Sequence, residues 1–204
     1  MDTLTKLNRK IEKNNAKFQE LAPAEKRVKI AKDVVKQLED KKLRAESGTY
    51  FALSGKGENL KNCLLQKVED PNLAQVTMST KCTVCGIGAL FVAAIENDGS
   101  VELQKGFTDY HIGQREIHNQ LKPYFTAKQL KLIEAFFERD LGFSHGRYFG
   151  GDYGTNSETI NEFQKHEIVR ERSAQKRLAM IMENIIENDG EFKPFGKDSP
   201  LHDK

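Results

Sequence analysis

This chain of 204 residues has no tryptophan, only three cysteines and five prolines, and no long apolar run. Its longest apolar stretch, Val84–Ile95, contains two glycines and falls short of the roughly 18 to 20 residues that span a bilayer. The first fifteen residues are polar and lack the apolar region of a secretory signal. An odd number of cysteines is typical of a reducing compartment, where thiols stay unpaired. We therefore expect a cytoplasmic protein that does not associate with membranes.

The composition is that of a folded, charge-rich protein, with 38% apolar and 30% charged residues. The net charge of +2 is too small to indicate nucleic-acid binding by itself. It is unevenly distributed, because residues 1–44 contain 13 Lys or Arg against 7 Asp or Glu. The length predicts a single domain over residues 1–204. Within it we expect a helical arm at residues 1–21 and a loosely ordered tail at residues 190–204, which contains two prolines.

Apolar residues recur with heptad spacing in the first expected helix. They are Leu4, Leu7, Ile11, Phe18 and Leu21, with Asn14 at the remaining core position. This spacing favours a helix packed on its own domain, and it leaves open a seam that binds a partner or a second copy of the chain.

The second expected helix, from Pro23 to about Asp40, has an apolar face opposite a lysine face. The lysines are Lys26, Lys29, Lys32 and Lys36. They are candidates for phosphate contacts in a nucleic-acid complex, although such a row is more often a solvated surface.

After these helices the pattern becomes mixed. The segment 42–53 is rich in β-compatible residues around Gly48 and predicts a strand or a short hairpin, and the segment 74–80 predicts another strand. A helix over about 82–97 is apolar on every side, so other elements must surround it. A further helix is predicted after Thr126, which has capping-box spacing to Gln129, and helical segments are predicted across 157–187. We therefore expect an α+β, mainly α fold, in which surrounding helices and a small antiparallel sheet pack on a central buried helix.

Cys82 and Cys85 form a C-x-x-C motif immediately before this apolar segment. With Cys63 they supply three of the four ligands of a zinc site, and no second C-x-x-C or H-x-x-x-H completes the set. A thioredoxin-like pair would require a fold that the rest of the chain does not predict. We expect no metal and no cofactor, and we expect both thiols to be packed as small apolar side chains.

A reactive alternative remains for Cys85. The stretch "CGIGAL" resembles the nucleophile helix of papain-like thiol hydrolases. That resemblance implies a thiolate stabilised by the helix N-terminus and a histidine base held by a polar group. The loop "SHGRYFGGDYG" offers His145 as base and Asp152 as its orienting group, and His111 is a second candidate base.

Two further resemblances concern other segments. Residues 24–97, with the Cys85-Gly86-Ile87-Gly88-Ala89 stretch, loosely resemble uncharacterised bacterial and phage proteins of no known activity. The stretch after residue 124 resembles the first helix of a homeodomain, through Phe125, Thr126, Gln129, Leu130, Ile133, Glu134 and Phe137. The basic stretch 163–177 is similar to its recognition helix, but Lys165 occupies the position of the adenine-reading asparagine.

Because the sequence contains no complete catalytic, nucleotide or metal motif, it favours a non-enzymatic protein that binds or inhibits a macromolecular partner. A phage or mobile-element origin and a homodimer are compatible with this interpretation. Residues expected to contact a protein partner are Leu4, Leu7 and Ile11 of the first helix, and Tyr148 and Phe149 of the aromatic loop. A cysteine hydrolase and a nucleic-acid-binding protein are the alternatives.

Overall fold

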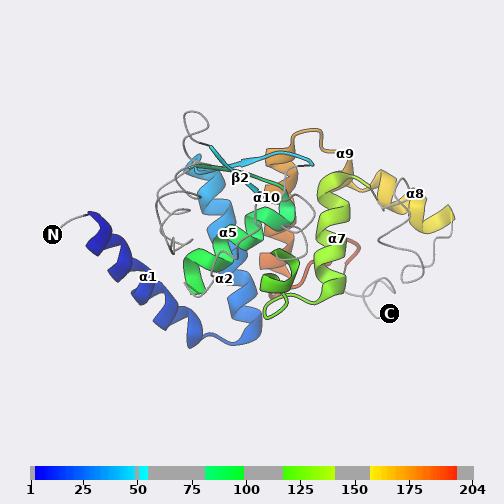
Figure 1. The fold of residues 1–204 in the computed structure, drawn as a ribbon. Helices are drawn as coiled ribbons and strands as arrows, with labels where there is room; N and C mark the ends of the chain where they lie inside the picture. The colour runs from blue at the N-terminus through cyan, green and yellow to red at the C-terminus, as the bar shows by residue number, and fades with distance from the viewer. Residues whose placement is uncertain (1–2, 49–50, 55–80, 99–116, 141–156, 197–204) are drawn as a thin grey trace.

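The computed structural model of the chain describes residues 3–48, 51–54, 81–98, 117–140 and 157–196. Within these ranges helices dominate and three short strands form one sheet (Figure 1). The predicted α+β, mainly α class is confirmed. The labelled elements are α1 (Thr3–Gln19), α2 (Pro23–Glu39), β1 (Leu43–Ala45), β2 (Phe51–Ser54), β3 (Lys81–Val84), α5 (Gly86–Asp98), α7 (Ala127–Glu138), α8 (Ser157–Lys165), α9 (Glu167–Arg170) and α10 (Ala174–Glu187).

The sheet is mixed, which corrects the expectation of an antiparallel one. Strand β3 lies in the middle, paired antiparallel with β2 and parallel with β1. The segment 42–53 therefore does not fold into a hairpin, because β3 is inserted between its two strands. Cys82 and Val84 point into the core while Lys81 is exposed, so the alternating burial of a one-sided sheet decides the register. The predicted strand at 74–80 lies outside the described residues.

Helix α5 is the central element, as predicted. Every residue from Gly86 to Asn97 is buried, since α1, α2 and α7 all contact this helix (Figure 1). It begins at Gly86 and not near residue 82, because β3 occupies the positions before Cys85. Burying large side chains such as Leu90 and Phe91 contributes about 1.5 to 3 kcal/mol each.

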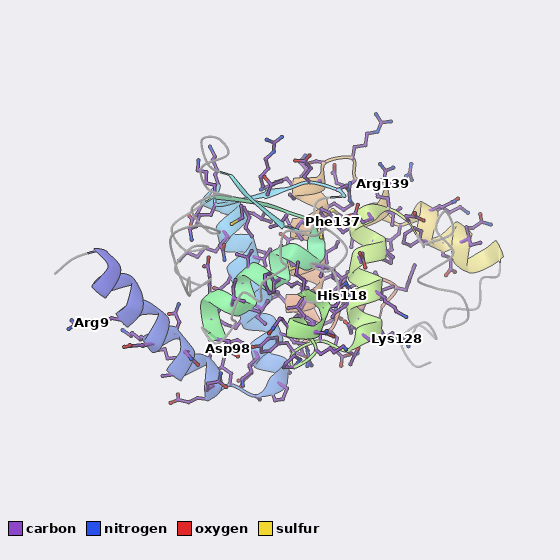
Figure 2. All side chains as sticks on the ribbon, viewed as in Figure 1. Arg9, Asp98, His118, Lys128, Phe137 and Arg139 are labelled. Carbon is purple, nitrogen blue, oxygen red and sulfur yellow. The ribbon has the colours of Figure 1, made fainter. Side chains whose placement is uncertain are left out.

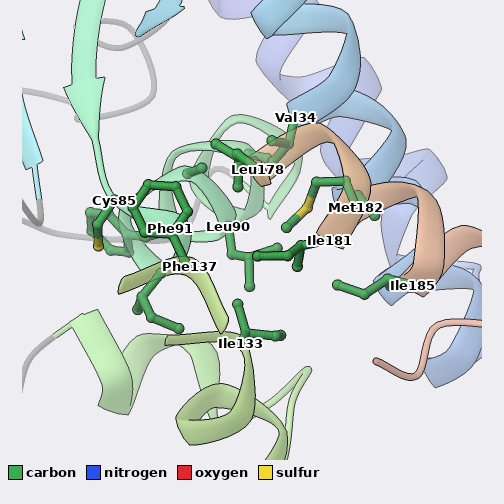
Figure 3. Packing of buried hydrophobic residues seen from close by; sticks show 14 of the residues in the cluster. Val34, Cys85, Leu90, Phe91, Ile133, Phe137, Leu178, Ile181, Met182 and Ile185 are labelled. Carbon is green, nitrogen blue, oxygen red and sulfur yellow. The ribbon is translucent and has the colours of Figure 1, made fainter. Parts of the chain in front are cut away.

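Two other helices complete the core around α5. Helix α7 begins where the capping pattern predicts, because the Thr126 hydroxyl accepts a hydrogen bond from the backbone N–H of Gln129 at 3.1 Å. Helix α10 packs along α2, where Leu178 and Met182 lie close to Val34 (Figure 3).

Aromatic rings gather around Phe136 of α7, which is fully buried. Four rings meet it in edge-on geometry, with centroids between 4.9 and 5.5 Å away: Phe163, His166, Phe192 and Phe195. Phe192, in the region expected to be a loosely ordered tail, is therefore part of the core, while residues 197–204 lie outside the described ranges.

The N-terminal end of α1 projects from the other described elements (Figure 1), while the helix also contacts α5. Its last turn is anchored by Phe18, which is 1% exposed and packs edge-on against the ring of Tyr124 at 5.6 Å. The division of the chain into one domain with an N-terminal arm stays a prediction.

Candidate functional site

Cys85 lies between β3 and α5 and is 2% exposed. Its Sγ accepts a hydrogen bond from the backbone N–H of Gly88 at 3.4 Å, in the position of a helix N-cap. Figure 3 shows the side chain at one end of the apolar cluster, beside Phe91 and Phe137. Cys82, on the inward face of β3, is 1% exposed. The structure thus places both thiols within the core.

The electrostatic environment of Cys85 opposes ionisation. Burial raises the pKa of this thiol far above its ordinary value, and the carboxylates of Glu138 and Glu134 raise it further. The N–H of Gly88 lowers the pKa, but burial outweighs it. A helix N-terminus therefore does not activate this cysteine. At neutral pH its sulfur carries a proton and is a poor nucleophile.

Cys82 is held protonated for the same main reason. Burial, followed by the negative charge of Glu96, raises the pKa of this thiol to about 12, although the ammonium group of Lys42 lowers it. Lys42 Nζ lies 3.7 Å from Glu96 Oε1, so these two charges also attract each other at the edge of the sheet.

The proposed partners of Cys85, namely His145, Asp152 and His111, lie outside the described residues. The described part of the chain contains two histidines, and no recorded hydrogen bond joins either one to Cys85. His166 caps α9, and its Nε2 lies 2.8 Å from the carbonyl oxygen of Pro194. The hydrolase arrangement has no support from the residues that the structure places.

His118 lies beside α7 (Figure 2), with Nε2 at 3.7 Å from a carboxylate oxygen of Glu134. Burial lowers the pKa of this histidine, and Lys122 and Lys131 lower it further, so the ring favours its neutral form. Sequence reasoning missed this pair because its members lie 16 positions apart and belong to no motif.

A second polar cluster, also missed, ties the end of α7 to the start of α10. Arg177 is only 2% exposed, and its guanidinium donates to the carbonyl oxygens of Phe137 at 2.6 Å and Glu171 at 2.7 Å. A further bond of 2.9 Å reaches the hydroxyl of Ser47. Because Arg177 follows a run of polar residues, its sequence context predicts a surface side chain, and only the tertiary packing buries it.

Glu138 belongs to the same cluster. Its carboxylate accepts the backbone N–H of Gly48 at 3.1 and 3.2 Å. Burial nevertheless raises the pKa of this carboxyl, since the hydrogen bond from Gly48 and the charge of Arg177 only partly offset it. Because Arg177 uses its donors on carbonyl oxygens and a hydroxyl of the fold, the cluster serves as an internal clamp.

The lysine face of α2 is partly used within the fold. Lys29 Nζ lies 2.6 Å from the carboxylate of Asp33, and Lys26 Nζ lies 5.4 Å above the ring of Phe18. Lys32 and Lys36 are exposed. Two of the four candidate phosphate-binding lysines therefore already make contacts within the chain.

The homeodomain resemblance does not extend to the proposed recognition helix. Residues 163–177 are divided among three helices, with breaks at His166 and at 171–173. Arg177, which would contact DNA in a basic helix, is instead buried. A single continuous helix able to enter the major groove is absent from this described stretch.

The residues expected to contact a protein partner are placed only in part. Leu4, Leu7 and Ile11 lie on the described helix α1, at positions that repeat along one side of it. Tyr148 and Phe149 lie outside the described residues.

Among the described residues, no three His, Cys, Asp or Glu side chains gather as a set of metal ligands. None of the described helices combines the length and the apolar content needed to cross a bilayer. The sequence matches no protein-family model, and comparisons with curated proteins and with solved structures found no significant match.

Proposed function

We propose that this protein acts without catalysis, by binding a macromolecular partner, and that α1 is one of the surfaces that it uses. The observation that carries the proposal is the placement of α1. The N-terminal end of this helix projects from the other described elements (Figure 1), although the helix also contacts α5, and its sequence repeats apolar residues in heptad spacing.

Phe18, the last core position within the helix, is buried and packs against Tyr124, and α1 also contacts α5. The exposed charges of Arg9 and Lys13 lie on the side of the helix away from the heptad row. A partner helix packing on that row would bury apolar surface next to a solvated basic side, which is the usual arrangement of a helix that binds another helix.

The burial of both described thiols supports the non-catalytic part of the proposal, because an attacking sulfur must be accessible and ionisable. The contacts of Lys26 and Lys29 within the fold likewise favour a protein partner over nucleic acid. A second copy of the chain is one such partner.

The test compares the double variant Leu7→Ser, Ile11→Ser with a matched control, Lys13→Ser, Ala16→Ser, whose original side chains are exposed. Sedimentation over a range of concentrations measures self-association, and capture from cells of the source measures binding to other proteins. We expect the wild type and the control to retain a common partner that the Leu7, Ile11 variant loses. If all three proteins are monomeric and capture identical sets of proteins, the proposal is wrong.

A further inference from the structure

Residues 191–196, which we call the strap, cross the ends of several helices without joining a sheet. Three successive strap residues are held through their main chain by side chains from different elements. Gln129 of α7 bonds both the N–H of Phe192 at 2.6 Å and its carbonyl oxygen at 3.3 Å. Asn184 of α10 bonds the N–H of Lys193 at 2.7 Å and its carbonyl oxygen at 3.3 Å.

The third contact joins the carbonyl oxygen of Pro194 to Nε2 of His166 at 2.8 Å. The backbone N–H of Ile168 donates to Nδ1 of the same ring at 3.2 Å. Since Nδ1 accepts that bond, the neutral ring carries its proton on Nε2 and donates it to Pro194. Each polar side chain therefore binds the main chain of the strap and not a strap side chain.

The side chains of the strap supply the apolar part of the contact. Phe192 is fully buried and Phe195 half-buried, and both meet the ring of Phe136 edge-on, at 5.2 and 5.5 Å. Main-chain hydrogen bonds together with separate sites for two apolar side chains are the features by which proteins recognise extended peptides. The surface under the strap, which we call the strap site, consists of Gln129, Phe136, His166 and Asn184.

The strap can leave this surface without breaking a helix or a strand pair. The recorded backbone bonds of its two ends are local, from Glu191 to Asn188 at 3.1 Å and from Gly196 to Lys193 at 3.2 Å. Helix α10 ends before the strap, at a turn in which Asp189 and Gly190 have positive φ angles of 53° and 90°. The amides of Gln129 and Asn184 would then be left with unpaired polar groups, which an incoming peptide could satisfy.

We propose that the strap site is a peptide-binding site, occupied in this structure by the chain's own strap. Its external ligand is an extended segment of a partner protein with the pattern aromatic–X–Pro–aromatic, matching Phe192 to Phe195. The strap then acts as an internal competitor that the partner segment displaces. This inference deepens the proposed macromolecular binding and adds a surface distinct from α1, so the α1 variants and the strap-site variants can fail independently.

The test uses the full chain and a fluorescent synthetic peptide of residues 188–199, NDGEFKPFGKDS. In the receptor, Phe192→Ala and Phe195→Ala weaken the internal strap and leave the strap site unchanged. We expect the peptide to bind this double variant at least about tenfold more tightly than the wild type, because a tethered competitor acts at a high effective concentration. A peptide with alanine at both aromatic positions should not bind.

Adding Gln129→Ala to the double variant should weaken the peptide further, whereas Gln164→Ala, which changes an exposed side chain of α8, should not. If the double variant does not fold, Phe195→Ala alone carries the same comparison. Equal binding of both peptides, or no binding to a folded strap variant, would overturn the proposal. A wild-type dimer that the peptide dissociates would instead assign the strap site to the strap of a second copy, and it would overturn the claim of a foreign partner.

Discussion

Replacing Arg177 by methionine tests whether the buried guanidinium holds the end of α7 to the start of α10. The substitution keeps much of the volume and removes the donors to the oxygens of Phe137, Glu171 and Ser47. Each hydrogen bond to a charged group contributes about 1.5 to 3 kcal/mol, and part of the total from these bonds offsets the cost of burying the cation. Because three buried oxygens each lose a donor, at about 1 to 3 kcal/mol apiece, and the cost of burying the cation disappears, we expect the free energy of unfolding to fall by about 3 to 5 kcal/mol.

The assay is urea unfolding followed by far-UV circular dichroism, with the slope of the transition checked for constancy between variants. Arg172→Met is the matched control, since the side chain of Arg172 is exposed, and it should change stability by less than about 0.5 kcal/mol. Arg177→Lys should fall between the two, because an ammonium group cannot reproduce the fork of donors. A loss below about 1 kcal/mol in Arg177→Met would refute the reasoning, because it would mean that the three oxygens find other donors at little cost.

Three further predictions concern the core. Iodoacetamide at pH 6 should leave Cys85 unmodified in the folded protein and modify it only in denaturant, so rapid labelling of the folded chain would contradict its burial. The pKa of His118 is lowered in the folded state, so the unfolded chain binds the proton more readily. The free energy of unfolding should therefore fall as the pH drops below about 6.5, by at most about 1.4 kcal/mol per pH unit. Unfolding curves of His118→Gln should lose that dependence, and an unchanged dependence would assign it to other groups. Gly86→Ala should destabilise the protein by about 1 to 3 kcal/mol, because the new methyl group would lie 3.0 Å from Cβ of Phe137. A melting temperature equal to that of the wild type would contradict this prediction and show that α5 and α7 separate easily.

Local patterns predicted those parts of the fold that depend on neighbours in the chain. The capping pattern at Thr126 correctly placed the start of α7, and the unbroken apolar run correctly identified α5 as the central helix. The strand pairing was wrong, because a hairpin around Gly48 and an inserted third strand require the same alternation of side chains. Nothing local distinguishes the two arrangements.

For the candidate site, the sequence led to the expectation that Cys85 packs in the core, and burial confirms this. The alternative with His145, Asp152 or His111 stays untested, since those residues lie outside the described ranges. The hydrogen bonds of Arg177 were not predicted because their acceptors are main-chain oxygens, which every residue has and which the pattern of side chains therefore does not reveal.

The order of apolar and polar residues by itself determined that this chain forms a mainly helical core around one helix that is apolar on every side. Such a helix is stable only when other elements exclude water from it. Tertiary structure alone decided where the polar groups within that core are satisfied. Gln129 illustrates the difference: its backbone N–H donates to the capping hydroxyl of Thr126 as the local pattern predicts, but its side chain binds the main chain of Phe192, 63 positions away. Hydrogen bonds between such distant residues exist only once the helices have packed, so no local pattern encodes them.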